Sequence, residues 1–393
     1  MADALENTCS VGLVGPKKLG RSSHPLPHDV LVEILSYLPS KTFIRLLSVC
    51  KTFHRLLSDS HFLLLQSCHN TAISGFLAQD APKTDITHLG DDRYADVPRS
   101  SLEVLRKFHF SILGSFGGLL FVLHWDERSS HGTGGNIFVY NLNRRTRCRL
   151  PSPPGKLISW GGIAAIFVND DDRVTKDYKL VYLSGNFSHQ CRVYDSTARA
   201  WTNYEMLDFG QGNLDYEHPV VCGDTVFWVS GIDELTDPYI VAFDTRKEST
   251  QVIPLPEIVV LTASKWDTMG IGKWEGKLLS LIHYQTFSCA FTLWSLTKAT
   301  EGAVGWVTAH EISLAQMGFT NMREYCIITG VMLSEVATTA SLVFDISDKV
   351  YSYSIKEGKL RKLGSAGFNY FTLFPYVSSL RPCGDHEELL EAM

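Results

Sequence analysis

Few side chains in this sequence of 393 residues have the types and spacing that catalysis needs. The acidic run Asp170 to Asp172 could bind a metal ion, but such a run between two apolar segments is more typical of a solvated turn. His310-Glu311 lacks the second histidine of a zinc-binding helix. The stretch "GIGKWEG", residues 270–276, has the glycines of a phosphate loop but no closing Lys-Ser or Lys-Thr. We therefore predict no catalytic residue, no cofactor and no metal site.

The nine cysteines also indicate no chemistry of their own. They are odd in number and widely spaced, and no C-x-x-C pair occurs, so neither a zinc ribbon nor a redox pair is predicted. Cys50, Cys191, Cys289 and Cys326 lie inside apolar runs, as free thiols in a reducing compartment do. With neither a signal-peptide pattern nor a run of about 18 apolar residues, we expect the cytoplasm, the nucleus or both.

Four arginines crowd one short stretch: Arg144, Arg145, Arg147 and Arg149. They could grip an acidic segment of a partner, or they could simply be solvated. The formal net charge of the whole chain is −6, from 36 basic and 42 acidic residues. Nucleic-acid binding usually requires a basic surface, so neither a nucleic acid nor a membrane is an expected partner.

The elements that would position binding residues begin after an N-terminal arm, residues 1–25, which has no periodicity and is expected to be disordered. Leu31, Ile34, Leu35 and Leu38 then form the apolar stripe of a short helix, which Pro39 ends. A second helical pattern begins at residue 40 and a third near residue 62. We predict three short helices in residues 26–66.

This helical segment carries more apolar residues than it can bury by itself. Domains of about 45 residues rarely stabilise themselves. Each large apolar side chain left over would gain roughly 1.5–3 kcal/mol on burial, so the rest of the chain or a partner should cover it. Periodicity alone leaves two interpretations open: an ordinary N-terminal helical subdomain, or a plug that inserts into a partner protein.

The stretch "LPHDVLVEILSYLPSKTFIRLLSVCKTFHRLL", residues 26–57, resembles an F-box. The F-box pattern combines Leu-Pro, a first helix ending in Leu-Pro, and a second helix carrying V-C-K-x-[W/F]. Two positions depart from it: Tyr37 stands where arginine is frequent, and Phe53 where tryptophan is frequent. The matching residues are Leu26, Pro27, Leu31, Ile34, Leu35, Leu38, Pro39, Val49, Cys50, Lys51 and Phe53.

The resemblance implies that the segment binds the Skp-type adaptor of a cullin-RING ubiquitin ligase. The motif does not say which of its residues face the adaptor, and Ile34 and Val49 are candidates for packing inside the helical segment instead. The adaptor-binding residues that the resemblance implies are Leu26, Pro27, Leu31, Ile34, Leu35, Leu38, Pro39, Leu46, Val49 and Phe53.

From about residue 105 the sequence is typical of an all-β structure, with short apolar runs separated by turn residues. One pattern recurs: an apolar run, an Asn or Asp, a polar turn and another strand, as in "FVYNLNRRTRCRL", "RVYDSTARAW" and "VAFDTRKESTQVI". Its anchors Tyr140, Tyr194, Phe243, Trp294 and Ser354 are spaced by 54, 49, 51 and 60 residues. Each period holds about four strands, the size of a kelch-type propeller blade.

We therefore predict an α+β multidomain protein: a three-helix F-box followed by an all-β propeller, with six blades favoured and a large β-sandwich as the alternative. The closing blade would combine strands near residues 84–116 with the terminal strand "FNYFTLFPYVSSL". The predicted boundaries are a linker at 67–104, the propeller at 105–380 and a frayed acidic tail at 381–393. The order of the repeats resembles the kelch-like or F-box-associated propeller of plant F-box proteins.

Taken together, the two resemblances imply a non-catalytic substrate receptor of an SCF-type ubiquitin ligase. The F-box would bind the adaptor, and through it cullin and a RING protein, while the propeller would hold a target protein for ubiquitination and proteasomal degradation. The alternatives are a propeller that binds a protein, metabolite or glycan outside ubiquitin transfer, and a propeller enzyme. Four aromatic residues near predicted turns could anchor a target or merely cap blade edges: Trp125, Trp160, Trp266 and Tyr284.

Overall fold

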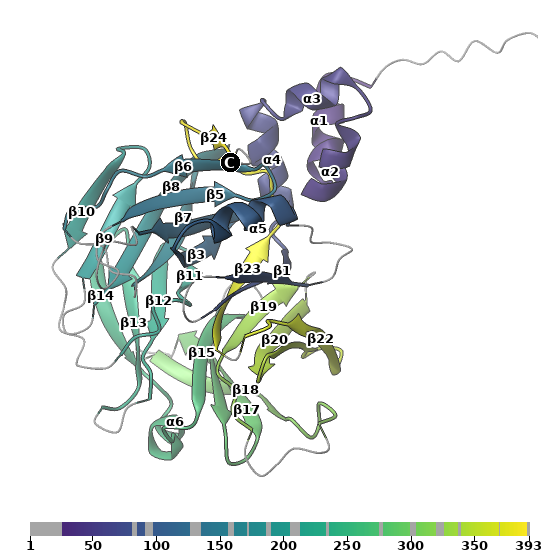
Figure 1. The fold of residues 1–393 in the computed structure, drawn as a ribbon. Helices are drawn as coiled ribbons and strands as arrows, with labels where there is room; N and C mark the ends of the chain where they lie inside the picture. Colours follow the sequence, from purple (N-terminus) through teal and green to yellow (C-terminus); the bar gives the residue numbers. More distant parts are fainter. Residues whose placement is uncertain are drawn as a thin grey trace, which may run out of the picture.

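The protein is a helical head mounted on a ring of β-sheets, as Figure 1 shows for the computed structural model. Residues 1–25, Trp160 and several other internal residues lie outside the part of the chain that the structure describes. The structure describes residues 26–80, 85–90, 97–125, 135–155, 161–170, 173–185, 190–204, 213–232, 236–274, 278–298, 304–319, 326–336, 339–368 and 370–390.

The head contains four short helices rather than the three predicted. They are α1 (His28–Ser36), α2 (Ser40–Leu46), α3 (Lys51–Leu56) and α4 (Ser60–His69). Pro27 and Pro39 stand at the N-caps of α1 and α2, where a missing N–H costs nothing. The second predicted helix is interrupted because Cys50 is fully extended, with φ −156° and ψ 159°, and becomes the N-cap of α3. The carboxylate of Asp59 caps α4 by accepting hydrogen bonds from the backbone N–H groups of His61 and Phe62.

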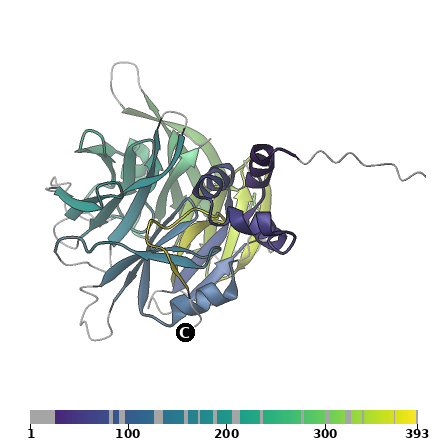
Figure 2. The same cartoon turned by 90° about the horizontal axis from the view of Figure 1, so that it is seen from above.

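Six antiparallel sheets form the six blades of a propeller, seen from above in Figure 2. Blade 1 contains β3 (Phe110–Phe116), β4 (Leu119–His124), β5 (Asn136–Asn141), β6 (Thr146–Arg149) and the short β24 (Glu388–Leu389). Blade 2 contains β7 (Gly161–Asp170), β8 (Arg173–Ser184), β9 (Gln190–Asp195) and β10 (Ala200–Tyr204). Blade 3 contains β11 (Val220–Cys222), β12 (Thr225–Val229), β13 (Tyr239–Asp244) and β14 (Ser249–Pro254).

Blades 4 to 6 continue the ring. Blade 4 contains β15 (Thr268–Trp274), β16 (Leu278–Gln285), β17 (Ala290–Lys298) and β18 (Val304–Ser313). Blade 5 contains β19 (Val331–Val336), β20 (Thr339–Ile346), β21 (Lys349–Ser354) and β22 (Lys359–Ser365). Blade 6 contains β23 (Phe371–Val377), β1 (Ile73–Asp80) and β2 (Ile86–Leu89). Two helices lie between strands, α5 (Arg99–Arg106) and α6 (Glu257–Thr262).

The repeated Asn or Asp that marks the sequence periods has a structural cause. Asn141, Asp195 and Asp244 each end the third strand of a blade, and each side chain accepts hydrogen bonds from two backbone N–H groups of the turn that follows. A residue with positive φ follows four positions later, at Arg145 in blade 1 and Arg199 in blade 2. The repeat therefore encodes the turn between the third and fourth strands.

The blades are held together by apolar side chains buried between neighbours. Phe121 of blade 1 and Tyr178 of blade 2 share one buried cluster, and Trp228 of blade 3 packs with Leu183 of blade 2 in the next. Each of the other four blade interfaces in the described part of the chain has a cluster of the same kind. Stacking in a ring buries both faces of each blade, which a single blade cannot do alone.

Ring closure differs from the expectation in its first strands. The terminal strand β23 does close the ring, but it pairs with β1, from Ile73↔Val377 to Asp80↔Phe371, while β3 belongs to blade 1. Residues 73–89, expected to be part of a linker, therefore contribute two strands to blade 6. They are separated from their partner strand β23 by the whole of blades 1 to 5, so the sequence period did not include them.

The loop before β11 spans the middle of the ring. The carboxylate of Glu217 accepts a hydrogen bond of 2.6 Å from the hydroxyl of Thr372. The imidazole of His218 lies 2.8 Å from the carboxylate of Asp215, and its Nε2 lies 3.0 Å from the carbonyl oxygen of Leu373. Blade 3 is thereby tied to β23 of blade 6, on the opposite side of the ring.

Candidate functional site

The head has a small core of its own, which the propeller completes. Leu380, which follows the last propeller strand β23, is fully buried within it. Leu35 is also buried there, so its predicted contact with an adaptor is wrong: its side chain already packs inside the head. The buried members of this core are Val32, Leu35, Phe43, Leu56, Phe62, Leu63 and Leu380.

Other large apolar side chains of the head face outward. Ile34 is 51% exposed and Val49 65% exposed, so these two residues face outward rather than packing inside the head. Val30 and Tyr37 are exposed as well, although the motif does not include them. A spacing of four residues from Leu26 to Val30 to Ile34 could have revealed this face of α1. We call the exposed residues Leu26, Pro27, Val30, Ile34, Tyr37 and Val49 the apolar head surface.

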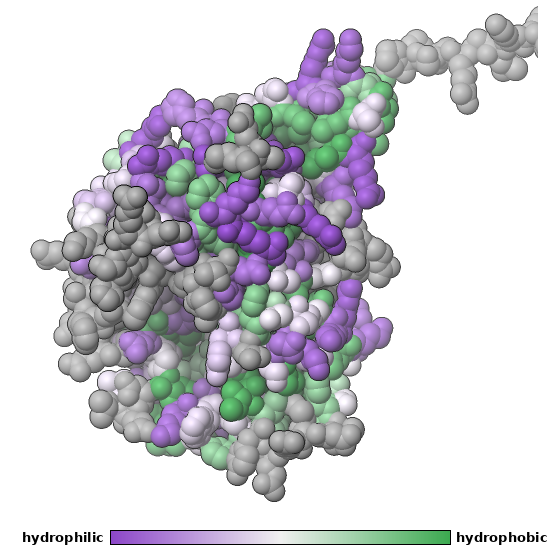
Figure 3. All heavy atoms as spheres, in the orientation of Figure 1, coloured by the Kyte–Doolittle hydropathy of each residue, from purple (hydrophilic) through white to green (hydrophobic). Residues whose placement is uncertain are grey.

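The remaining predicted adaptor-binding residues divide by burial. Pro39 is exposed, whereas Leu31, Leu38, Leu46 and Phe53 are half-buried and pack against the head core. Figure 3 shows hydrophobic side chains gathered on the head, at the upper right of the molecule. Exposed apolar patches of this kind often mark the surface where a protein binds a partner.

Hydrogen bonds seat the head on the segment that follows β23. The side chain of Gln66, fully buried on α4, accepts a 2.9 Å hydrogen bond from the backbone N–H of Leu380. The same amide donates to the carbonyl oxygen of Leu38, at 3.1 Å, and to the hydroxyl of Ser40, at 3.2 Å. Ser40 in turn donates to the carbonyl oxygen of Ser378, at 2.8 Å. One amide therefore connects α4, the start of α2 and the propeller.

The ends of α1 and α4 are joined in the same way. The hydroxyl of Ser36 lies 2.8 Å from Nδ1 of His69, and the imidazole stacks on Tyr37 with ring centroids 3.8 Å apart. Asn70 donates a 3.0 Å hydrogen bond to the carbonyl oxygen of Ser36. These contacts hold α1 in a defined orientation, so its exposed face is presented rigidly.

The four aromatic residues proposed as target anchors differ in how far their side chains are exposed. Tyr284 is wrong as an anchor, because its side chain is fully buried and its hydroxyl donates to the carbonyl oxygen of Cys326 at 2.8 Å. Trp125 is half-buried and packs in the cluster between blades 1 and 2. Trp266 is exposed. Trp160 lies outside the described residues.

The arginine-rich stretch, residues 144–149, binds an acidic segment of the same chain, the tail that begins at residue 381. Arg144 pairs with Glu387 at 2.6 Å, and Arg147 pairs with Glu388 at 3.2 Å. β24 adds to the outer edge of β6, and Leu390 is buried against blade 1. The tail, expected to be frayed, is thus bound through residue 390.

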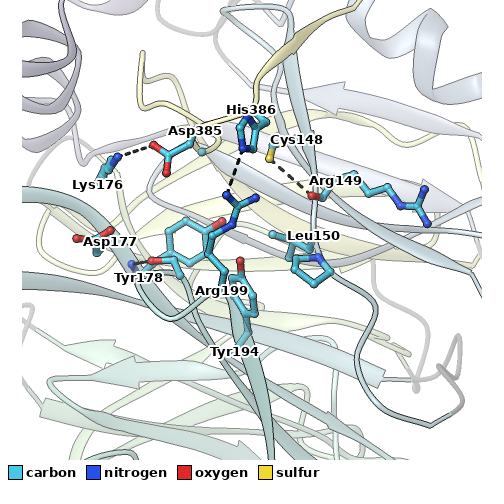
Figure 4. Close-up of a pocket in the computed structure, with 13 residues that line it drawn as sticks. Cys148, Arg149, Leu150, Lys176, Asp177, Tyr178, Tyr194, Arg199, Asp385 and His386 are labelled. Carbon is cyan, nitrogen blue, oxygen red and sulfur yellow. Dashed lines mark hydrogen bonds and ion pairs between the residues drawn. The ribbon is translucent and has the colours of Figure 1, made fainter.

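Figure 4 shows the side of the tail that faces blade 2. Lys176 forms an ion pair with Asp385, and Arg199 lies 3.2 Å from the imidazole of His386. The pocket between these residues has a volume of only about 50 Å³. Burial raises the pKa of the Cys148 thiol at its edge, so this cysteine is not an activated nucleophile.

No site for a metal or a membrane was found in the described part of the chain. Within those residues, no three His, Cys, Asp or Glu side chains come together as a metal site would require. None of the described helices is both long and apolar enough to cross a membrane.

A larger cleft lies between the head and blade 5. It has a volume of about 610 Å³ and runs between the end of α4, the start of β1 and the outer strands of blade 5. Ile73 and Phe76 supply apolar lining, and Ser74 and Ser352 supply hydroxyl groups. Its volume lies in the range of pockets that bind small molecules.

The fold and the head surface together define a class: a protein with an F-box-like head and a six-bladed β-propeller. Residues 25–64 match the F-box-like family model, which agrees with the extent of the helical head. The propeller that follows contributes all six sheets.

Related sequences include plant proteins that are described as F-box proteins. A putative F-box protein of Arabidopsis thaliana is 21% identical over 353 residues, covering 86% of this chain and 90% of the relative. A putative F-box/kelch-repeat protein of the same plant is 23% identical over 387 residues, covering 90% and 92%. Among solved structures, an oligogalacturonate lyase aligns with 75% of this chain and 85% of its own, at 12% identity and a TM-score of 0.37, too low to support a conclusion about activity.

Proposed function

We propose that the protein is the substrate-recognition subunit of an SCF-type cullin-RING ubiquitin ligase, working in the cytoplasm, the nucleus or both. The head binds a Skp-type adaptor, and through it cullin and the RING protein. The propeller holds a target protein for ubiquitination and proteasomal degradation. The observation that carries this proposal is the apolar head surface, which belongs to a segment matching the F-box-like family and which the propeller leaves uncovered.

The mechanism is proximity rather than chemistry by this chain. Holding a target near a charged ubiquitin-conjugating enzyme raises the effective concentration of its lysines. The receptor therefore needs two binding surfaces and a rigid connection between them. Gln66, Ser40 and Leu380 supply that connection at the junction of head and propeller.

The test is co-purification of the full chain with a plant Skp-type adaptor. Leu26→Asp combined with Ile34→Asp places two carboxylates on the apolar head surface. We expect adaptor affinity to fall by at least about a hundredfold, since each substitution removes an apolar contact and buries a charge. Both side chains are exposed, so the variant should fold. Adaptor binding that survives this double substitution would refute the proposal.

Leu261→Asp is the control, because Leu261 is an exposed leucine outside the head, 73% accessible against 60% for Leu26. It should leave adaptor binding unchanged.

The second candidate is a propeller that binds a small molecule outside ubiquitin transfer. The 610 Å³ cleft beside blade 5 favours it, since clefts of this size at domain boundaries often hold ligands. If no Skp-type adaptor binds the wild-type chain, while a metabolite shifts its melting temperature and Phe76→Trp abolishes that shift, this candidate replaces the first.

A further inference from the structure

The cleft between the head and blade 5 lies beside the interface between blades 5 and 6. In that interface, Met332 and Val343 of blade 5 pack with Leu89 of blade 6 in a buried apolar cluster. The cleft is lined by the start of β1 from blade 6, by β20, β21 and β22 from blade 5, and by His69 and Asn70 at the end of α4. A molecule bound there would therefore contact both blades and the head.

The pairing of the strands shows how this face of blade 5 changes from apolar to polar. Residues directly opposite each other on neighbouring antiparallel strands project from the same face of a sheet. Met332 pairs with Val343, and both belong to the apolar cluster. Two residues further along, Ser334 pairs with Ser341, and Ser341 pairs on its other side with Ser354. The apolar face thus continues into a row of three serines at the cleft.

Hydroxyl groups around the cleft retain hydrogen-bonding capacity. Ser334, at the inner end of the row, is only 3% exposed, and its Oγ has no hydrogen-bond partner in the described part of the chain. Oγ of Ser354 accepts a 3.3 Å hydrogen bond from the backbone N–H of Glu357. On the opposite wall, Oγ of Ser74 accepts a 2.8 Å hydrogen bond from the backbone N–H of Ser378. Because a hydroxyl has a proton to donate as well as lone pairs, Ser354 and Ser74 can each still donate to an oxygen placed in the cleft.

The other side chains of the lining favour a ligand that is uncharged and partly apolar. Ile73 of β1 and Leu363 of β22 are half-buried and contribute apolar surface. Nζ of Lys359 lies 3.5 Å from the carboxylate of Glu357, and Arg361 has an interaction of its own within the chain. Since these charges are met inside the protein, an ion entering the cleft would have to compete for them.

We propose that the cleft binds a small uncharged molecule that has an apolar ring or chain on one side and carbonyl, ether or hydroxyl oxygens on the other. The oxygens accept hydrogen bonds from Ser354 and Ser74, and the apolar part covers Ile73 and Leu363. The volume of about 610 Å³ admits a molecule of the size of a typical ligand. The inference deepens the second candidate function by naming its ligand class, and it holds whether or not the chain also binds an adaptor.

The experiment titrates the full chain with prodan, an uncharged naphthalene that carries one ketone oxygen and whose emission moves to shorter wavelength in an apolar site. We expect saturable binding. Ser352 lines the cleft and shares the face of the serine row, because it pairs with Val343. Ser352→Leu fills part of the cleft, so the dissociation constant for prodan should rise about tenfold or more. Ser352→Ala removes only the hydroxyl, and a rise of about threefold to tenfold is expected for one lost hydrogen bond.

Ser295→Leu is the matched control. Ser295 is also half-buried on the third strand of a blade, but it lies on β17 of blade 4 and does not line the cleft. This variant should keep the prodan affinity of the wild type. The anionic probe 8-anilinonaphthalene-1-sulfonate tests the requirement for an uncharged ligand. Any binding of this sulfonate should be the same in Ser352→Leu as in wild type, since the cleft does not take it up.

Four outcomes overturn the proposal. They are the absence of saturable prodan binding, wild-type prodan affinity in Ser352→Leu, an equal loss in Ser295→Leu, and an equal loss of the sulfonate probe in Ser352→Leu. Failure here is distinguishable from failure of the receptor function, because Leu26 and Ile34 do not line the cleft. The Leu26→Asp, Ile34→Asp double variant should therefore lose the adaptor and keep prodan, whereas prodan lost in that variant would place its site on the apolar head surface.

Discussion

At the scale of single residues, burial separates side chains that the sequence pattern treats alike. Ile34 and Leu35 are adjacent and equally apolar, yet only Leu35 is buried in the head. The helical period identifies one apolar stripe along α1. It does not show which residues of that stripe pack inside the head and which face outward. Tyr284 shows the same limit, because its place near a turn did not reveal that β16 runs through the core of blade 4.

The pair formed by His218 and Asp215 predicts a pH dependence of stability. Burial alone would lower the pKa of His218, but the neighbouring carboxylate raises it to about 9. Burial alone would raise the pKa of Asp215, but the charge and hydrogen bond of His218 hold it below its usual value. Because the imidazole binds its proton more tightly in the folded state, the pair's stabilisation is complete below the unfolded histidine pKa of about 6.5 and disappears as the pH rises through about 9. The Asp215 part disappears in acid, below about pH 4.

We expect His218→Gln to lower the free energy of unfolding by about 1–2 kcal/mol at pH 6, allowing for partial exposure of the pair, and by much less at pH 9.5. Urea unfolding at the two pH values measures the difference. An equal loss at both values would show that the imidazole contributes packing and hydrogen bonding rather than charge.

At the scale of elements, the acidic tail is a structural strand rather than a loose end. β24 pairs with β6, and the ion pair of Arg144 with Glu387 is mostly buried, its side chains only 12% and 17% exposed. The composition of residues 381–393 indicated a frayed end because charge runs are usually solvated. The partner that orders it, the arginine-rich turn of blade 1, is more than 200 residues away in the sequence.

We predict that ending the chain after Gly384 lowers the free energy of unfolding by about 2–4 kcal/mol, since it exposes the site of Leu390 and leaves Arg144 buried without its carboxylate. Denaturant unfolding measures the loss, and faster amide exchange in β6 locates it. Asp385→Asn is the control: its ion pair with Lys176 is exposed, so the effect should stay within about 0.5 kcal/mol. A truncated chain as stable as the full one would contradict this assignment.

At the scale of the whole molecule, the class of fold could be predicted because one short strand–turn–strand pattern repeats along the sequence. The recurring strand–turn–strand pattern, whose turn starts with Asn or Asp in blades 1 to 3, gave the period, and the period gave the number of blades. Blade 6 could not be placed in this way, since β1 and β2 lie before blade 1 in the sequence and their partner β23 comes only after blade 5. The motif predicted Leu26, Pro27, Ile34 and Val49 of the apolar head surface, whereas Val30 and Tyr37 were recognised only from their exposure in the structure.

The position of Leu380 has a consequence for how the protein is made. A ribosome releases the head first, but a leucine that completes its core and the backbone group that Gln66 needs arrive only after the last blade. The nascent head must therefore wait, incompletely packed, through the synthesis of almost the entire ring. Its leucine-rich helices would need shelter during that interval, so early attachment of the adaptor to the growing chain would protect them from aggregation.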